Sequence, residues 1–479
     1  MIKGLGLGLA FVGLTATVWA QKPSAPAAAV SIGVYQLPEA RRVELSNGLV
    51  LLLLEKHELP LTAVTVALRT GTLQDPAGKP GVSSLTEELL RKGTTNRTAE
   101  DISDQIDFIG MQFGGGGGRG GGGASYDSTS ISADFLARDT DKALGIVADL
   151  VLHPVFPEAE LKKSIAQRQE RLKTEKDNAE GAVAQYFLAA LYAAHPYSGA
   201  TLTSEGSLGS ISRDDVVGFY KRVYTPANAV IAVVGDFKSV QMEARLKALF
   251  GGWQGAAPQA VRVPALRPVT GRHVVLVDKA DATQTYFIVG NVGISDSDPD
   301  RAPARVVNLL FGGRFTSMFN DELRIKSGYS YGASSRFEEF RTPGPFYMST
   351  YTRNATTEPA IDKTLEVLDR LHAHPFSDAT LTSAKNYIRG TFPPTLETSP
   401  ALARRLATNE VEGISREKFN AELAQEQATT LADANRVIDR DFPLRDNYVM
   451  VIVGKASEIG AIAAKYGAVT RKNITDPGY

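Results

Sequence analysis

Residues 81–94 read Gly-Val-Ser-Ser-Leu-Thr-Glu-Glu-Leu-Leu-Arg-Lys-Gly-Thr, and this stretch decides how the rest of the chain is interpreted. Its apolar residues follow the spacing of one buried helical stripe: Val82, Leu85 and Leu89. Ser84 and Glu88 are i, i+4 neighbours, so a helix points both side chains the same way. The stretch therefore predicts an amphipathic helix that carries Ser84, Glu87 and Glu88 on its other side.

The spacing of Ser84 and Glu88 is also that of the inverted zinc motif His-x-x-Glu-His. That motif places two imidazoles on one metal, with a glutamate between them as the base. Here Ser84 and Glu88 stand where the histidines would be, and Glu87 stands where the base would be. A hydroxyl and a lone carboxylate do not make the set of about three protein ligands that zinc needs. Ser84 to Glu87 also fits a capping box, Ser-x-x-Glu before an apolar run, and that alternative stays open at this point.

Residues 81–94 resemble the motif segment of the pitrilysin/insulinase family of zinc peptidases, where a glycine opens the helix and Lys-Gly-Thr closes it. The likeness is to the processing-peptidase-like bacterial branch. The resemblance implies a third zinc ligand, a glutamate on a long helix about 80 residues further on. Arg171 falls on that position, with Glu170 beside it. A guanidinium repels a metal cation, so the resemblance predicts that this chain itself binds no metal.

A second likeness to the family lies in residues 323–331, Leu-Arg-Ile-Lys-Ser-Gly-Tyr-Ser-Tyr. Arg324 and Tyr331 match an arginine and a tyrosine that bind substrate in the second half of family members. A cation and a phenol suit that role, because they stabilise the negative charge that grows on a carbonyl oxygen under attack. Alternatively, Arg324 is a charge at a helix end and Tyr331 a core aromatic of a strand.

Residues 114–123 are glycine except for Arg119. A phosphate-binding loop would need Gly-Lys-Ser/Thr, which does not follow. Low complexity alone indicates a flexible segment. The resemblance adds a hypothesis that the run contacts peptide substrate through its central residues, which are Gly116, Gly117, Arg119, Gly120 and Gly121.

Composition limits the compartment and the partners. The 52 basic and 53 acidic residues nearly cancel, which gives no electrostatic case for nucleic acid. Residues 1–20 have the pattern of a secretory signal peptide, and residues 21–38 that of a flexible lead-in. There is no cysteine, which excludes disulfides and thiolate zinc sites. We therefore expect a periplasmic or secreted bacterial protein that is not attached to a membrane after cleavage.

The chain contains an internal duplication. Asn228 to Asp236 and Asn447 to Lys455 are similar apolar strands, and each follows a matching order of helices and strands at a period of about 220 residues. We expect an α+β fold of two homologous halves, residues 39–252 and 273–479, each a mixed sheet with helices packed mainly on one face. The proline-rich residues 253–272 would link them.

The family resemblance, taken with the missing ligands, implies a zinc-ligand-deficient, substrate-binding subunit of a two-chain periplasmic metallopeptidase. The zinc would be bound by a catalytic partner of the same family with an intact motif, and unfolded peptide would be the substrate. Two alternatives stay open, namely a self-sufficient zinc peptidase with an atypical ligand set and a peptide-binding scaffold without protease activity.

Overall fold

A computed structural model describes residues 35–115, 125–193, 195–198 and 203–479. The predicted signal peptide, most of the predicted lead-in and residues 116–124, which include most of the glycine run, lie outside the described residues. Within the described part, no helix combines the length and the apolar character needed to cross a bilayer.

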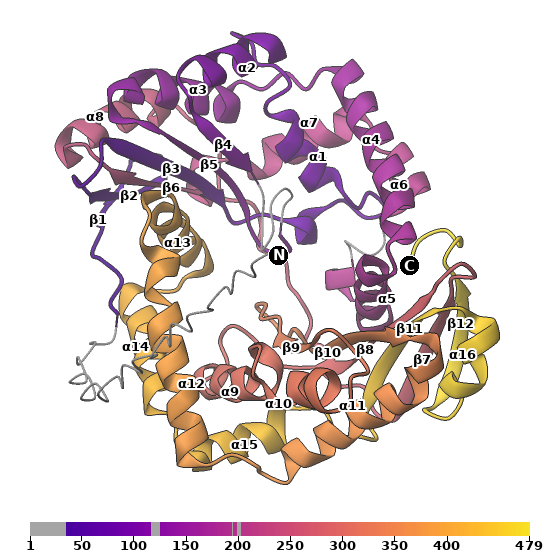
Figure 1. The fold of residues 1–479 in the computed structure, drawn as a ribbon. Helices are drawn as coiled ribbons and strands as arrows, with labels where there is room; N and C mark the ends of the chain where they lie inside the picture. The colour runs from indigo at the N-terminus through magenta and orange to yellow at the C-terminus, as the bar shows by residue number, and fades with distance from the viewer. Residues whose placement is uncertain (1–34, 116–124, 194, 199–202) are drawn as a thin grey trace, which may run out of the picture. The chain divides into compact units, whose positions relative to one another are not determined.

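Two six-stranded mixed sheets form the framework of the described chain (Figure 1). The first has the strand order β1-β2-β6-β3-β5-β4, and the second has the order β12-β7-β11-β8-β10-β9. The strands of the first sheet are β1 Arg41–Glu44, β2 Val50–Glu55, β3 Leu61–Leu68, β4 Gln112–Gly115, β5 Thr129–Leu136 and β6 Ala229–Gly235. Those of the second are β7 Arg272–Asp278, β8 Gln284–Val292, β9 Ala333–Phe337, β10 Pro345–Arg353, β11 Tyr448–Gly454 and β12 Ala468–Asn473.

The pairing of the strands repeats between the sheets. In the first, β2 runs parallel to β6, and β3 is antiparallel to both β6 and β5. In the second, β7 runs parallel to β11, and β8 is antiparallel to both β11 and β10. The outer strands differ, because β1 is antiparallel to β2 whereas β12 is parallel to β7. The expected α+β fold of two homologous halves is confirmed.

Helices cover both sheets. Those before residue 260 are α1 Val82–Leu89, α2 Ala99–Phe108, α3 Thr140–Leu152, α4 Glu158–Asp177, α5 Ala179–Tyr192, α6 Glu205–Gly209, α7 Arg213–Val223 and α8 Ser239–Phe250. Those after it are α9 Arg301–Asn308, α10 Met318–Asn320, α11 Thr357–His372, α12 Asp378–Thr391, α13 Ser399–Glu412, α14 Arg416–Ala428, α15 Leu431–Asp441 and α16 Ala456–Ala463. Each half packs most of its helices on one face of its own sheet, as predicted.

The opposite face of each sheet is covered by a helix from the other half (Figure 1). Leu402, Ala403 and Ala407 of α13 pack against strands of the first sheet. Val183 and Phe187 of α5 pack against strands of the second sheet. The two halves therefore share their apolar cores, and neither sheet is buried on both faces without the other half.

The motif helix α1 begins at Val82, directly after Gly81 in the left-handed conformation with φ 99°. The Asp75 carboxylate accepts hydrogen bonds from the backbone N–H groups of Gly81 and Ser83, each at 2.7 Å. The cap of α1 is thus a remote aspartate that satisfies first-turn N–H groups. The capping box that Ser84 could have formed is wrong, because Ser84 already lies inside the helix.

Candidate functional site

The face of α1 that carries the motif positions is turned toward α4. Val82, Leu85 and Leu89 are fully buried in the first core, as the predicted stripe requires. The opposite side holds Ser84 and Glu88 at partly buried positions, one helical turn apart. The i, i+4 spacing predicted from the sequence therefore exists in the fold.

Arg168 of α4 binds both motif positions at once. Its Nη2 donates to the Ser84 carbonyl oxygen at 2.9 Å and to Glu88 Oε2 at 2.8 Å. Its Nε donates to the same Glu88 oxygen at 3.0 Å. One cation on α4 therefore bonds the side chain of Glu88 and the main chain of Ser84, the two positions where the inverted motif would place a metal's ligands.

The ionisation of Glu88 reflects this arrangement. Burial disfavours its charged form, but the charge of Arg168 and hydrogen bonds from Ser164 and Arg168 outweigh that effect and lower the pKa of Glu88. Glu88 is therefore an ion-paired carboxylate near neutral pH. One of its two carboxylate oxygens, Oε2, is already engaged by a cation of the chain itself.

Glu87, at the position of the motif's base, is buried with an exposed fraction of 6%. Burial raises its pKa to about 7, although the charges of Arg91 and Arg168 oppose the rise. A carboxyl group with that pKa is a mixture of neutral and charged forms in neutral solution. In the inverted zinc motif, the glutamate at this position acts as a base on metal-bound water.

The motif does not fit a zinc ion. Ser84 offers a hydroxyl, Glu88 offers a carboxylate already in an ion pair, and Arg168 places a positive charge between them. A guanidinium at that distance from a carboxylate repels a second cation, and zinc requires about three nitrogen, sulfur or carboxylate ligands. Across the residues that the structure describes, no group of three or more histidine, aspartate or glutamate side chains is placed to hold a metal ion.

Glu170 and Arg171 lie on another side of α4. Both are exposed, and Glu170 forms an ion pair with Lys173 at 3.6 Å. The family resemblance puts Arg171 at the third ligand position, whereas the residue of α4 that contacts the motif is Arg168. The helical period could have shown this, because the inward-facing residues of α4 recur every three or four positions, at Leu161, Ser164, Arg168 and Leu172.

Arg324 and Tyr331 flank the entry to β9. Arg324 lies in a short π-helical turn, Asp321–Lys326, and its guanidinium sits 4.6 Å from the centroid of the Phe315 ring. Tyr331 has an exposed fraction of 79%, which excludes the core-aromatic alternative. Phe315 and Ile325 are also largely exposed. Arg324 and Tyr331 thus lie beside solvent-facing apolar side chains.

A buried asparagine ties this segment together. Asn320 Nδ2 donates to the Phe315 carbonyl oxygen at 2.6 Å, and Asn320 Oδ1 accepts from the Ala333 backbone N–H at 3.1 Å. Asn320 therefore links the loop below Arg324 to the strand that follows Tyr331. Sequence reasoning missed Phe315 and Asn320, because neither residue belongs to a motif. The only available signal was that Phe315 is an aromatic residue at a position expected to be exposed.

The glycine run begins at the end of β4, the outermost described strand of the first sheet. Gly114 and Gly115 belong to that strand, and the proposed substrate contacts at Gly116, Gly117, Arg119, Gly120 and Gly121 lie outside the described residues. His372 and His374, the closely spaced histidines, have separate partners, namely the Pro443 carbonyl oxygen and the Asp439 carboxylate.

Two models of one peptidase family match successive parts of the chain. Residues 50–205 match the model for Insulinase (Peptidase family M16), and residues 210–388 match the model for the Peptidase M16 inactive domain. The chain belongs to the insulinase family. The first match contains α1, and the second contains Arg324 and Tyr331.

Bacterial proteins described as uncharacterized zinc proteases are similar to most of this chain. A zinc protease of Mycobacterium leprae is 26% identical over 356 residues, which are 73% of this chain and 77% of that protein. A zinc protease of Mycobacterium bovis is 25% identical over 421 residues, 87% of this chain and 92% of that protein.

Solved structures show the same fold. A Peptidase M16 inactive domain from Pseudomonas fluorescens superposes with a TM-score of 0.79 at 23% identity, over 87% of this chain and 97% of that one. A protease from Helicobacter pylori superposes with a TM-score of 0.77 at 20% identity, over 87% of this chain and all of that one.

Proposed function

We propose that this protein is the substrate-binding, zinc-ligand-deficient subunit of a two-chain periplasmic metallopeptidase. The partner is a catalytic chain of the insulinase family with an intact His-x-x-Glu-His motif, and the substrate is unfolded peptide. In this pair the present chain binds no metal, and the zinc belongs to the partner. The signal-like residues 1–20 support the periplasmic location.

The observation that carries the proposal is that Arg168 donates hydrogen bonds to the Ser84 carbonyl oxygen and to the Glu88 carboxylate. A degenerate motif alone could still recruit a metal through neighbouring side chains. A guanidinium bonded to the Glu88 carboxylate and the Ser84 carbonyl puts a permanent positive charge beside the motif, because arginine does not deprotonate in proteins. Hydrolysis by an assembly that contains this chain therefore needs a metal held elsewhere.

Arg324 and Tyr331 supply what this chain adds to the reaction. Both lie at the surface of the second half and can reach a molecule bound there. When water adds to a peptide carbonyl, the negative charge that forms on its oxygen is stabilised by a fixed cation and a phenol O–H. Arg324 is a fixed cation of this kind, because the Phe315 ring lies against it.

Peptide binding is supported by the edge of the first sheet. β4 pairs with β5 on one side and is the last described strand on the other. An extended peptide can add to such an edge through main-chain hydrogen bonds. The glycine run that follows β4 fits a role in admitting peptide, and deletion of residues 114–123 should then weaken substrate affinity.

The proposal is tested by producing the chain together with a catalytic family member and measuring peptide cleavage by the purified pair. Arg324→Ala should reduce the activity 10-fold or more, as loss of an oxyanion donor does. Glu87→Gln should leave it near wild type, since the base that acts lies on the partner. The reverse pattern would reject the assignment.

A further inference from the structure

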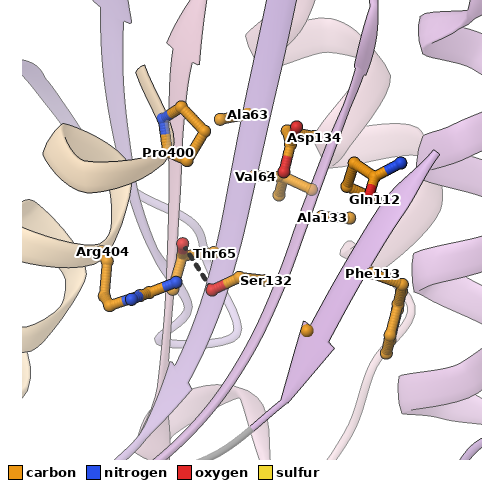
Figure 2. Close-up of a pocket in the computed structure, with 11 residues that line it drawn as sticks. Ala63, Val64, Thr65, Gln112, Phe113, Ser132, Ala133, Asp134, Pro400 and Arg404 are labelled. Atoms are coloured by element: carbon orange, nitrogen blue, oxygen red, sulfur yellow. Dashed lines mark hydrogen bonds between the residues drawn. The ribbon is translucent and has the colours of Figure 1, made fainter. Parts of the chain in front are cut away.

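A polar pocket lies on the face of the first sheet that α13 covers, at the β4 edge (Figure 2). Its volume is about 220 Å³. The polar side chains that line it come from three strands and one helix: Thr65 of β3, Gln112 of β4, Ser132 and Asp134 of β5, and Arg404 of α13. The motif helix α1 packs on the opposite face of this sheet, so the pocket is separate from the motif.

The strand register fixes the positions of these residues. Gln112 lies directly opposite Asp134 on neighbouring strands, and Thr65 lies opposite Ser132. Thr65 and Ser132 satisfy each other through a hydroxyl–hydroxyl hydrogen bond of 3.1 Å. Figure 2 shows the Arg404 side chain near this pair and Asp134 nearer to Gln112. A negative and a positive group therefore line different parts of one pocket.

Asp134 is the negatively charged residue of the pocket. Among the residues described, no hydrogen bond or ion pair reaches its carboxylate, and it does not pair with Arg404. Burial raises the pKa of Asp134, and the charge of Arg404 only partly opposes this. Arg404 is exposed and keeps its contact with water. A partly desolvated anion gains most from a ligand that brings a cation with N–H donors.

The size of the pocket limits the ligand. Pockets that enclose a whole drug-sized molecule measure roughly 300–1,000 Å³. A pocket of about 220 Å³ suits one residue or the end of a chain. The pocket also opens next to β4, the edge strand beside which an extended segment can continue.

We propose that this pocket binds the free amino terminus of a peptide. The Asp134 carboxylate accepts from the terminal ammonium, the Gln112 side-chain oxygen offers a second acceptor, and the Arg404 guanidinium donates to a carbonyl oxygen of the first residues. This inference rests on the proposed peptide-binding role and adds to it a preference for substrates with an unmodified terminus.

The test compares two 15-residue unstructured peptides (the length chosen to reach beyond one pocket, roughly 50 Å extended). They carry the same fluorophore at the carboxyl end and differ only in acetylation of the amino terminus. Binding to the full chain is measured by fluorescence anisotropy. Acetylation should weaken binding 10-fold or more, since it removes a charge-assisted hydrogen bond. Asp134→Asn, which keeps the shape of the side chain, should weaken binding of the free peptide by a similar factor.

The decisive readout is the coupling between the two changes. In Asp134→Asn the free and acetylated peptides should bind equally, whereas in Asp104→Asn, an exposed aspartate of α2, the preference should persist. Equal affinity of both peptides for the wild-type chain would overturn the amino-terminus assignment and leave the peptide-binding role standing. Failure of both peptides to bind would overturn the inference together with that role.

Discussion

Arg168 determines what the degenerate motif can do. It joins α4 to α1 through a carboxylate and a backbone carbonyl, both partly withdrawn from water. A zinc ion in the inverted motif would make the same connection between the same two helices. The guanidinium thus links the two helices as a metal ion would, but it is not a Lewis acid.

Removing this guanidinium should destabilise the fold. Arg168→Ala leaves the half-buried Glu88 carboxylate without its partner, and we expect a loss of about 1–3 kcal/mol in the free energy of unfolding. Arg171→Ala, on the exposed side of the same helix, is the matched control and should change it by less than about 0.5 kcal/mol. Urea denaturation of both variants gives the comparison. Equal effects would show that the Arg168 contacts contribute nothing specific.

Glu87 makes stability depend on pH. Its pKa is about 7 in the folded chain against 4.5 for an unburied glutamate, so the folded state binds the proton more tightly. Its contribution to stability is full below about pH 4.5 and is lost as the pH rises through about 7. Glu87→Gln removes this loss. Between about pH 5 and about pH 8 the variant should gain up to about 3 kcal/mol relative to wild type, measured by denaturation at both values. A constant difference would contradict the assignment.

At the scale of single elements, the turn from Phe315 to Ala333 presents the proposed substrate contacts. A π-helical turn puts Arg324 over Phe315, and Asn320 fixes the loop against β9. Irregular helical turns of this kind are frequent at functional sites. The geometry makes Phe315 a positioning residue for Arg324.

Phe315→Leu should therefore lower the activity of the assembled pair about 3- to 10-fold through kcat, because a cation–π contact at an exposed site contributes about 0.5–1 kcal/mol and also restricts the guanidinium. Phe315→Tyr should restore the activity, since the ring remains. In an Arg324→Ala background, Phe315→Leu should have little further effect. Steady-state kinetics of the four variants measures this, and a full additional loss in the double variant would argue that Phe315 acts by itself.

Local patterns predicted the elements well and their long-range partners poorly. Val82, Leu85 and Leu89 form the buried stripe that their spacing indicated, and the two similar apolar segments of the duplication are the strands β6 and β11. The cap from Asp75 and the contact of Arg168 depend on tertiary packing, which no local pattern encodes. Arg171 was assigned from the family spacing alone, and a shift of three residues along α4 separates it from Arg168, the residue that contacts the motif.

At the scale of the whole chain, the exchange of helices makes the two halves interdependent. α13 buries one face of the first sheet, and α5 buries one face of the second. The duplication was visible in the sequence, but this exchange was not, because the apolar positions of α5 and α13 do not say which sheet they contact. Each half alone would expose an apolar sheet face to water.

Fragments split within the linker, at residue 260, should therefore be insoluble or partly unfolded when produced separately. Produced together, they should form a soluble complex whose circular dichroism matches that of the intact chain, because α5 and α13 can then reach the opposite sheets. Size-exclusion chromatography and circular dichroism of each preparation decide the matter. A folded, soluble fragment of residues 39–260 alone would contradict the interdependence.

The most direct test is zinc titration of the purified chain by calorimetry, with metal content measured in parallel. Because Arg168 holds Ser84 and Glu88, we predict no zinc site of micromolar or tighter affinity in the wild-type chain, and the same result for Glu88→Gln. Binding of about one zinc ion per chain that is lost in Glu88→Gln would contradict this prediction.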